Sequence, residues 1–350
     1  MASTRSGVLC VGSIVVDVAK VIDAYPDQER LTLIRDVSVS TGGPALNLAV
    51  DLSRLGAPFP LELVGVVGDD EHGRLVRDAC SALSIDTSAL RMVPDVATSF
   101  TDAMVVRDGG SRTFFHHPGA SALLSAQDVD VTGSRAKILH VGAPGLHPRM
   151  DAPGQGGGNG WASLLQAAQS VGMRTTMELV SLPDEQIRAV ALPCLPNLDY
   201  LVINEIEAAA LTGAQIQPAD VDGHPHWSAL ESVAMALVEL GVSRLVAVHF
   251  PAGCVAAAPG GLLWRQGSLR LPRSAVRNAT GAGDAFAAGV IYGLHEELPV
   301  AQCLRLGVCV AAASLEGAGT SDGVQPVTQC LALGDRHGFR STSGPIHGDA

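Results

Sequence analysis

A glycine-rich stretch near the end of the chain combines the residue types that phosphoryl transfer needs. It runs Asn278-Ala279-Thr280-Gly281-Ala282-Gly283-Asp284-Ala285-Phe286 and leads into a helical pattern. Gly281 and Gly283 let the backbone approach a ligand closely, and unpaired N–H groups at a helix start attract an anion. Asp284 would repel that anion, so its expected use is to remove a proton from a hydroxyl attacking it. The stretch predicts an anion hole at Gly281, Ala282 and Gly283, with Asp284 as general base.

Other motifs explain this stretch less well. A dinucleotide fingerprint needs a third glycine, where Phe286 stands. A P-loop needs Gly-Lys, but both lysines of the chain, Lys20 and Lys137, follow alanine. The glycosylation pattern Asn278-Ala279-Thr280 carries little weight without a secretory signal. The alternative that remains is a glycine-rich helix start in which Asp284 is a plain cap.

A second stretch, Thr41-Gly42-Gly43-Pro44-Ala45-Leu46-Asn47, places a double glycine before a helical pattern. Pro44 suits a first helical position, and the double glycine can be a hinge or a surface that a ligand approaches closely. Asn47 lies one turn into the helix and could offer amide donors and an acceptor to sugar hydroxyls. The alternative is an ordinary strand-to-helix turn with Asn47 facing solvent.

The composition of the 350-residue chain favours a globular protein with a large core. Its hydrophobic content is 47% and its net charge is −12, without a basic block. That charge argues against nucleic acid or an anionic membrane as a partner. The seven cysteines include no Cys-x-x-Cys pair, and no signal-like or bilayer-spanning apolar run is present. We expect a soluble cytoplasmic protein with reduced thiols.

Strand-like and helical patterns alternate along most of the chain. Strand-like runs occupy 8–19 (interrupted at Gly12), 31–39, 61–68, 137–141, 174–179, 198–203 and 244–249, and helical patterns occupy 44–55, 73–83, 161–171, 205–211 and 226–240. This alternation predicts an α/β fold with a doubly wound, mostly parallel sheet that carries helices on both faces.

A β-hairpin is predicted at 100–107 and 112–117, joined across Asp108-Gly109-Gly110. With the run at 31–39 it would form a small sheet that acts as a lid. We predict one domain over residues 1–335, with lid strands from about 15–40 and 98–118, and a disordered tail at 336–350. A small sheet leaves edges and an apolar face uncovered, so we expect the lid to pair with its copy in a homodimer.

Together these stretches resemble the ribokinase-like family of carbohydrate and nucleoside kinases over residues 7–325. The matching elements are Thr280–Phe286, Gly42-Gly43 with Asn47, Gly12–Asp17, Gly68-Asp69-Asp70 with Gly73, and Asn204 with Glu207. The resemblance implies a doubly wound kinase with a lid that phosphorylates a hydroxyl of a sugar or nucleoside with ATP. It assigns Asp284 as base and Gly281–Gly283 as anion hole.

The resemblance also implies roles for residues outside that motif. Substrate contacts fall on Asp17, Gly42, Gly43 and Asn47, with Glu178 at a strand end as a further candidate that is equally well explained as a structural acid. Nucleotide contacts fall on Asn204, Thr280 and Gly253. Metal contacts fall on Glu207 and Asn204 for Mg²⁺, and on Asn278 for a monovalent cation, most plausibly K⁺.

The chain departs from the family pattern at three places. Asn278 stands where most relatives have Asp, so we expect weak activation by K⁺ or none. Val248-His249-Phe250 replaces the usual Thr-Leu-Gly, and Val15 replaces an Asn of ribokinases proper. The main prediction is a sugar kinase, and the alternative is a nucleoside kinase similar to pseudouridine or adenosine kinases. A nucleotide-binding regulator without catalysis is the alternative from another class.

Three other patterns are not expected to carry chemistry. Gly319-Thr320-Ser321-Asp322-Gly323 matches a nucleophile elbow but lacks the strand before it and the helix after it. His116 and His117 are neighbours on a strand and point to opposite faces, so they cannot chelate one metal, although one of them could overhang the substrate. Buried thiols are expected at Cys194, Cys254, Cys303 and Cys309.

Overall fold

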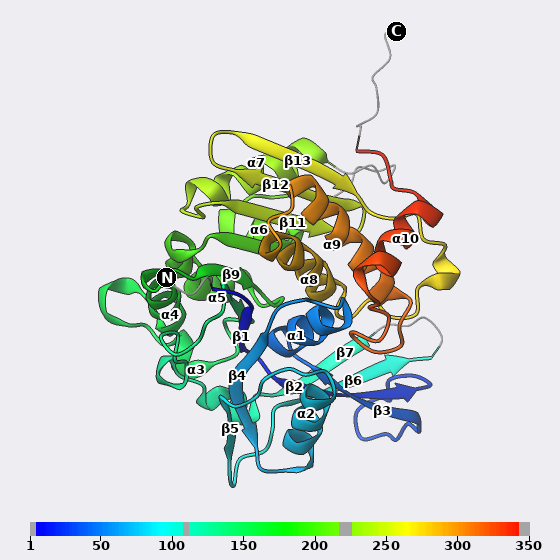
Figure 1. The fold of residues 1–350 in the computed structure, drawn as a ribbon. Helices are drawn as coiled ribbons and strands as arrows, with labels where there is room; N and C mark the ends of the chain where they lie inside the picture. Colours follow the sequence, from blue (N-terminus) through cyan, green and yellow to red (C-terminus); the bar gives the residue numbers. More distant parts are fainter. Residues whose placement is uncertain (1–4, 108–111, 217–225, 343–350) are drawn as a thin grey trace.

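A nine-stranded β-sheet lies at the centre of the computed structural model, which describes residues 5–107, 112–216 and 226–342 (Figure 1). In spatial order its strands are β13 (Leu262–Gly267), β12 (Gly253–Ala258), β11 (Leu245–Phe250), β10 (Tyr200–Asn204), β9 (Arg174–Glu178), β8 (Ile138–Gly142), β1 (Val8–Gly12), β4 (Leu61–Gly68) and β5 (Leu90–Val93). The strands from β11 to β5 are parallel, whereas β12 and β13 are antiparallel at one edge. The predicted mostly parallel sheet is therefore confirmed.

Helices cover both faces of this sheet because successive side chains of each strand point to opposite sides. In β1, Val8 and Cys10 pack into one core cluster, and Leu9 and Val11 pack into the other. The first cluster includes residues of α1 (Pro44–Arg54), α2 (Glu71–Ala82), α8 (Ala282–His295), α9 (Val300–Leu315) and α10 (Val327–His337). The second includes residues of α3 (Pro148–Asp151), α4 (Gly160–Ser170), α5 (Asp184–Ala191), α6 (Glu205–Thr212) and α7 (Trp227–Glu239). Figure 1 shows α1, α8 and α9 side by side.

Short 3₁₀ turns lie between these elements. They occupy Gly119–Leu123, Ala126–Asp128, Gln155–Gly157, Leu192–Asn197 and Arg273–Ala275.

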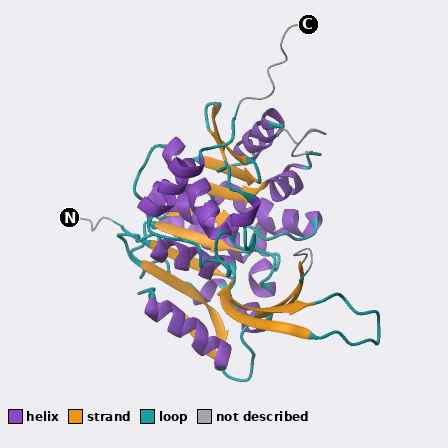
Figure 2. Cartoon of the chain, turned by 90° about the vertical axis from the view of Figure 1, so that its right-hand side faces the viewer, coloured by secondary structure: helices purple, strands orange, loops and turns teal. Residues whose placement is uncertain are grey.

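A second, four-stranded sheet projects from the main body (Figure 2), and we call it the lid sheet. Its strand order is β3 (Ile34–Gly42), β2 (Val15–Ile22), β6 (Phe100–Val106) and β7 (Arg112–His117). β6 and β7 form the predicted antiparallel hairpin, and its predicted turn at 108–110 lies outside the described residues. The register places Asp17, Thr101 and His116 directly opposite one another, so their side chains share one face of the lid sheet.

The strand-like run at 8–19 consists of two strands, which separate at its predicted interruption, Gly12. β1 ends at Gly12 in the main sheet, and β2 begins at Val15 in the lid sheet. Gly12 has φ +138°, and a Cβ there would lie 2.1 Å from the carbonyl oxygen of Gly142, so only glycine fits this exit. The run at 31–39 lies in the lid sheet as predicted, where it forms the edge strand β3, and β2 lies between it and the hairpin.

The remaining predicted elements agree with the structure except at their ends. α2 begins at Glu71 and not at residue 73, because Asp70 caps it by accepting a 2.8 Å hydrogen bond from the Gly73 N–H. The expected disordered tail is wrong for residues 336–342, since α10 ends only at His337 and Phe339 bridges to Leu269. Residues 343–350 lie outside the described residues. The elements β5, β12, β13, α3, α5, α9 and α10 have no predicted counterpart.

All seven cysteines are free thiols and buried, which confirms the interpretation of Cys194, Cys254, Cys303 and Cys309. In the described part of the chain no helix has both the length and the apolar character that crossing a bilayer would need.

Candidate active site

A cavity of about 400 Å³ opens at the carboxyl ends of β9, β10 and β11, beside the lid sheet and the first turns of α1 and α8. Ligands of open α/β sheets bind at this edge. The predicted site residues that line it are Asp17, Gly43, Asn47, Glu178, Asn204, Glu207, Thr280, Gly281, Gly283 and Asp284. The fold therefore gathers most of the predicted site around one cavity.

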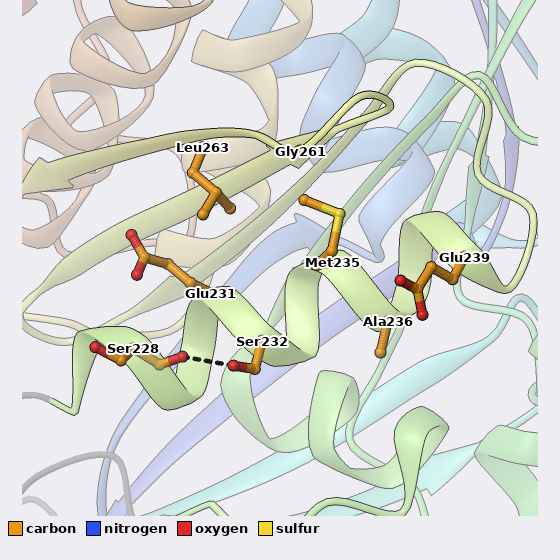
Figure 3. A pocket seen from close by; sticks show the side chains of 8 residues that line it. All are labelled: Ser228, Glu231, Ser232, Met235, Ala236, Glu239, Gly261 and Leu263. Carbon is orange, nitrogen blue, oxygen red and sulfur yellow. Dashed lines mark hydrogen bonds between the residues drawn. The ribbon is translucent and has the colours of Figure 1, made fainter.

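A second hollow lies against α7 and the hairpin that leads into β13 (Figure 3). No predicted site residue lines it, and the side chains of Glu231 and Ser232 there are already engaged. Arg265 donates two hydrogen bonds to Glu231, each 2.7 Å, and the Ser232 hydroxyl donates to the Ser228 carbonyl at 2.9 Å. We therefore place the candidate active site in the first cavity.

The predicted anion hole is the N-terminal turn of α8. Gly281 is its N-cap and has φ +84°, and a Cβ there would lie 2.5 Å from the carbonyl oxygen of Thr320. The first i→i−4 bond of the helix runs from the Ala285 N–H to the Gly281 carbonyl at 2.9 Å. The N–H groups of Gly283 and Asp284 precede that bond, so the helix leaves them for another acceptor, whereas the Ala282 N–H is bonded to the Ala279 carbonyl at 3.4 Å.

Asp284 lies in the first turn of α8 and is held from the opposite side by α1. The Asn47 amide donates a 2.6 Å hydrogen bond to Asp284 Oδ2, across 237 residues of sequence. Burial is the main reason that the pKa of Asp284 rises to about 8; nearby Glu178 adds to the rise, and the Asn47 bond opposes it. A carboxyl group with this pKa can hold or release a proton near neutral pH.

Asn47 is buried rather than solvent-facing, which excludes the alternative of an exposed turn residue. It was expected to contact substrate, but one of its donors is committed to Asp284.

Glu178 ends β9 and lies on the cavity wall, backed by a histidine. His140 Nε2 is 2.9 Å from Glu178 Oε1, and both side chains are buried. Burial, with Glu207 nearby, holds the pKa of Glu178 well above its usual range, and burial lowers the pKa of His140 to about 3. At neutral pH His140 is therefore an uncharged hydrogen-bond partner and not a counter-ion.

The double glycine lets Asp17 approach α1. A Cβ at Gly42 would lie 2.1 Å from Asp17 Oδ2, and a Cβ at Gly43, which has φ +91°, would lie 2.5 Å from the Ser13 carbonyl oxygen. Gly42 was predicted to contact substrate, but it does not line the cavity. It lies against Asp17, which does. Burial raises the pKa of Asp17 to about 6.

Asn204 and Glu207 form a capping box at the start of α6. Asn204 Oδ1 accepts the Ile206 and Glu207 N–H groups at 2.9 and 2.8 Å, and Glu207 Oε2 accepts the Asn204 N–H at 3.1 Å. Burial raises the pKa of Glu207 to about 7. No cluster of three His, Cys, Asp or Glu side chains suited to a metal occurs within residues 5–107, 112–216 and 226–342. The Glu207 carboxylate nevertheless fits Mg²⁺, because this ion keeps several of its water ligands and needs only one or two carboxylates from the protein.

Asn278 and Thr280 contact the lid sheet. The Arg112 guanidinium, on β7, donates to both Asn278 Oδ1 and Thr280 Oγ1. Asn278 Oδ1 also accepts the Thr280 N–H at 2.8 Å, and its Nδ2 donates to the Ala318 carbonyl at 3.0 Å. The Asn278 side chain is thus fully engaged by protein groups and does not line the cavity.

Several residues of the site region were missed or misread in the sequence. His249 lines the cavity beside Gly283, where a Cβ would lie 3.2 Å from its Cε1, and burial lowers its pKa to about 4. Thr320 lines the cavity from within the rejected elbow pattern. Arg112 carried no motif signal. Gly253, the expected nucleotide contact, starts β12 opposite Phe250 and Gly267 and is not part of the lining.

Comparisons with known proteins agree with this geometry. The model of the pfkB family carbohydrate kinases matches residues 5–327. A probable fructokinase-7 of Arabidopsis thaliana is 28% identical over 296 residues, covering 83% of this chain and 79% of that protein. Among solved structures, an Arabidopsis thaliana ribokinase complexed with ribose and ATP aligns with a TM-score of 0.75 at 20% identity, covering 94% of this chain and 98% of that one. A Methanocaldococcus jannaschii nucleoside kinase aligns with a TM-score of 0.71 at 17% identity, covering 95% and 98%.

The crowding of Asp284 and Glu178 predicts an unusual pH dependence. Asp284 accepts a proton only when ionised, so kcat/KM should rise with pH until it levels near the pKa of about 8. Replacing Glu178 by Gln removes a competing acid, so the rising limb should move to lower pH. The measurement is kcat/KM against pH for whichever acceptor the enzyme phosphorylates. A rise of kcat/KM centred near pH 4 in the parent would contradict the role of Asp284 as base. A rise that Glu178→Gln does not shift would contradict it as well.

Proposed function

Because the chain belongs to the pfkB family of carbohydrate kinases, we propose that it transfers the γ-phosphate of ATP to a hydroxyl group of a small sugar. Asp284 is the general base in this proposal, and the N–H groups of the turn at Gly281–Gly283 receive the charge of the transferred phosphoryl group. The observation that carries the proposal is the position of one buried carboxylate inside the N-terminal turn of a helix. There it is held by Asn47 and flanked by an anion-binding backbone.

The acids of the cavity suit an acceptor rich in hydroxyl groups. Asp17 on β2 and Glu178 on β9 lie on the cavity wall and can each accept hydrogen bonds from hydroxyls. We propose that they orient the sugar so that the reacting hydroxyl lies against Asp284 Oδ1, since Oδ2 is bonded to Asn47. Proton removal by Asp284 then coincides with attack on the γ-phosphate.

We propose Glu207 and Asn204 as the residues that hold Mg²⁺ together with the phosphates of ATP. The cation would neutralise charge on the phosphates, which four neighbouring acids would otherwise repel. The nucleotide assignment is supported by the likeness to a ribokinase whose structure was solved with ribose and ATP. Thr280 at the mouth of the anion hole remains the proposed nucleotide contact, and Gly253 is a weaker candidate because it lies outside the cavity lining.

One observation favours a nucleoside as the alternative acceptor. The register of β7 puts Phe114 on the same face as Arg112 and His116, which is the face that carries Asp17. Phe114 is 54% exposed there and could stack on a base as well as on the apolar face of a sugar. A nucleoside kinase is therefore the second candidate.

The opposite face of the lid sheet supports a homodimer. Val39 and Val18 pair across β3 and β2, and the row reaches Phe115 on β7 through Asp102 on β6, which forms an ion pair with Lys20. Val37, Val39 and Phe115 are each about half exposed, which leaves an apolar surface uncovered. We propose that two copies of the chain cover this face for each other.

Replacement of the base tests the reaction. Asp284→Asn keeps the shape of the side chain and removes its basicity, so turnover should fall by about 10²–10⁴-fold while nucleotide binding survives. The measurement is ADP release with a panel of sugars and nucleosides, with Asp335→Asn on the exposed face of α10 as control. Variant activity within a few-fold of the parent would contradict the role of Asp284. If the parent turns over no compound of the panel, the proposed kinase activity is contradicted.

Replacement of one lid aromatic tests the dimer. Phe115→Asp should shift the sedimentation coefficient from dimer to monomer at micromolar concentration, because a charge would be buried at the interface. Phe114→Asp, on the other face, is the matched control and should leave the dimer intact. A monomeric parent would contradict the pairing.

A further inference from the structure

Arg112 is an arginine of the lid sheet whose role the proposed function does not explain. Among the described residues, most other arginines whose side chains have a partner pair with an acid, as Arg91 does with Asp128 at 2.8 Å and Arg265 with Glu231 at 2.7 Å. No acid pairs with Arg112 within the described residues, and its bonds go to two uncharged oxygens, Asn278 Oδ1 and Thr280 Oγ1. Partial burial lowers the pKa of Arg112, because removing a guanidinium charge from water costs free energy.

The position of that charge connects the lid to the anion hole. Asn278 and Thr280 directly precede Gly281, and the Thr280 N–H is bonded to Asn278 Oδ1 at 2.8 Å. The guanidinium therefore fixes both side chains of the turn that aims the N–H groups of α8. It lies 166 residues away in sequence, on a strand of the lid sheet. The turn gains this support only while the lid sheet lies over the cavity.

The same contacts do not fit a monovalent cation at Asn278. Such an ion needs oxygen ligands, but Asn278 Oδ1 already accepts two donors, and the neighbouring Ala318 carbonyl accepts the Asn278 Nδ2–H. Donors of the protein thus occupy the oxygens that the ion would use. A positive charge is present at this position, and it belongs to Arg112.

We propose that Arg112 is a positioning residue for phosphoryl transfer, which supplies from the lid the cation that orders the turn at residues 278–283. The inference rests on the proposed kinase function. It makes lid closure and assembly of the anion hole a single event, and it makes turnover independent of K⁺. It also places a positive charge at the mouth of a cavity that no Lys or Arg lines among the described residues.

Arg112→Met tests the proposal because it keeps the length of the side chain and removes the charge. We expect kcat to fall by about 10- to 100-fold, the worth of charge-assisted hydrogen bonds, with little change in KM for the acceptor. The parent should not respond to KCl at constant ionic strength. The variant should regain activity with millimolar guanidinium or K⁺, which a merely structural role would not produce. Arg112→Lys should lie between the two.

Arg107→Met is the matched control. Arg107 follows β6 and is exposed; its backbone N–H is bonded to the Ile22 carbonyl, and its guanidinium lies 3.8 Å from Asp23 Oδ1. Its loss should leave kcat and the salt response unchanged. A parent that requires K⁺, or an Arg112→Met variant with parental kcat, would overturn the proposal.

Hydrogen–deuterium exchange separates this inference from the kinase assignment. In ligand-free protein the peptide covering residues 278–284 should exchange faster in Arg112→Met than in the parent or in Arg107→Met. Unchanged exchange would overturn the positioning role even if the enzyme is a kinase. If exchange is faster in Arg112→Met but the parent shows no turnover, the positioning contact of Arg112 is supported and the proposed reaction is refuted.

Discussion

Acidic side chains crowded into one buried cavity are the constraint on which the rest of the structure depends. The carboxyl groups are those of Asp17, Glu178, Glu207 and Asp284, and burial raises the pKa of each one. A base with a raised pKa takes up a proton readily near neutral pH, which suits proton removal from a hydroxyl. The same charges would repel a triphosphate. In the proposed reaction the N-terminal turn of α8, Arg112 and Mg²⁺ held at Glu207 would supply the positive potential that the triphosphate needs.

The fold meets this constraint by bringing backbone close to the acids. Asn47 at the start of α1 bonds to Asp284 at the start of α8, so two helices from opposite ends of the chain meet at the reacting carboxylate. Gly281 must be glycine because its backbone lies against the Thr320 carbonyl, and the absence of a side chain at Gly42 leaves room for the Asp17 carboxylate. Both contacts position atoms of the cavity wall. The glycines of the two sequence motifs are therefore needed for packing as well as for chemistry.

Local patterns predicted the parts of the site that depend on local backbone. Gly281–Asp284 could be identified because an anion hole needs glycines and a helix start in sequence order, and the structure has both. His140 and Arg112 could not be identified, because neither lies in a motif. His140 contacts Glu178, 38 residues away, and Arg112 contacts Asn278, 166 residues away. The strand order of the lid sheet could not be predicted for a similar reason. Hydrophobic periodicity marks a run at 8–19 but does not say which strand pairs with which.

The state of Asp284 is the centre of this account, and an infrared titration measures it directly. The protonated-carboxyl band that disappears in Asp284→Asn can be followed against pH in the ligand-free enzyme. The account predicts that this band persists through neutral pH and titrates near 8, because the carboxyl group is buried beside Glu178. A band that is lost by about pH 5, as for an ordinary carboxyl group, would contradict it.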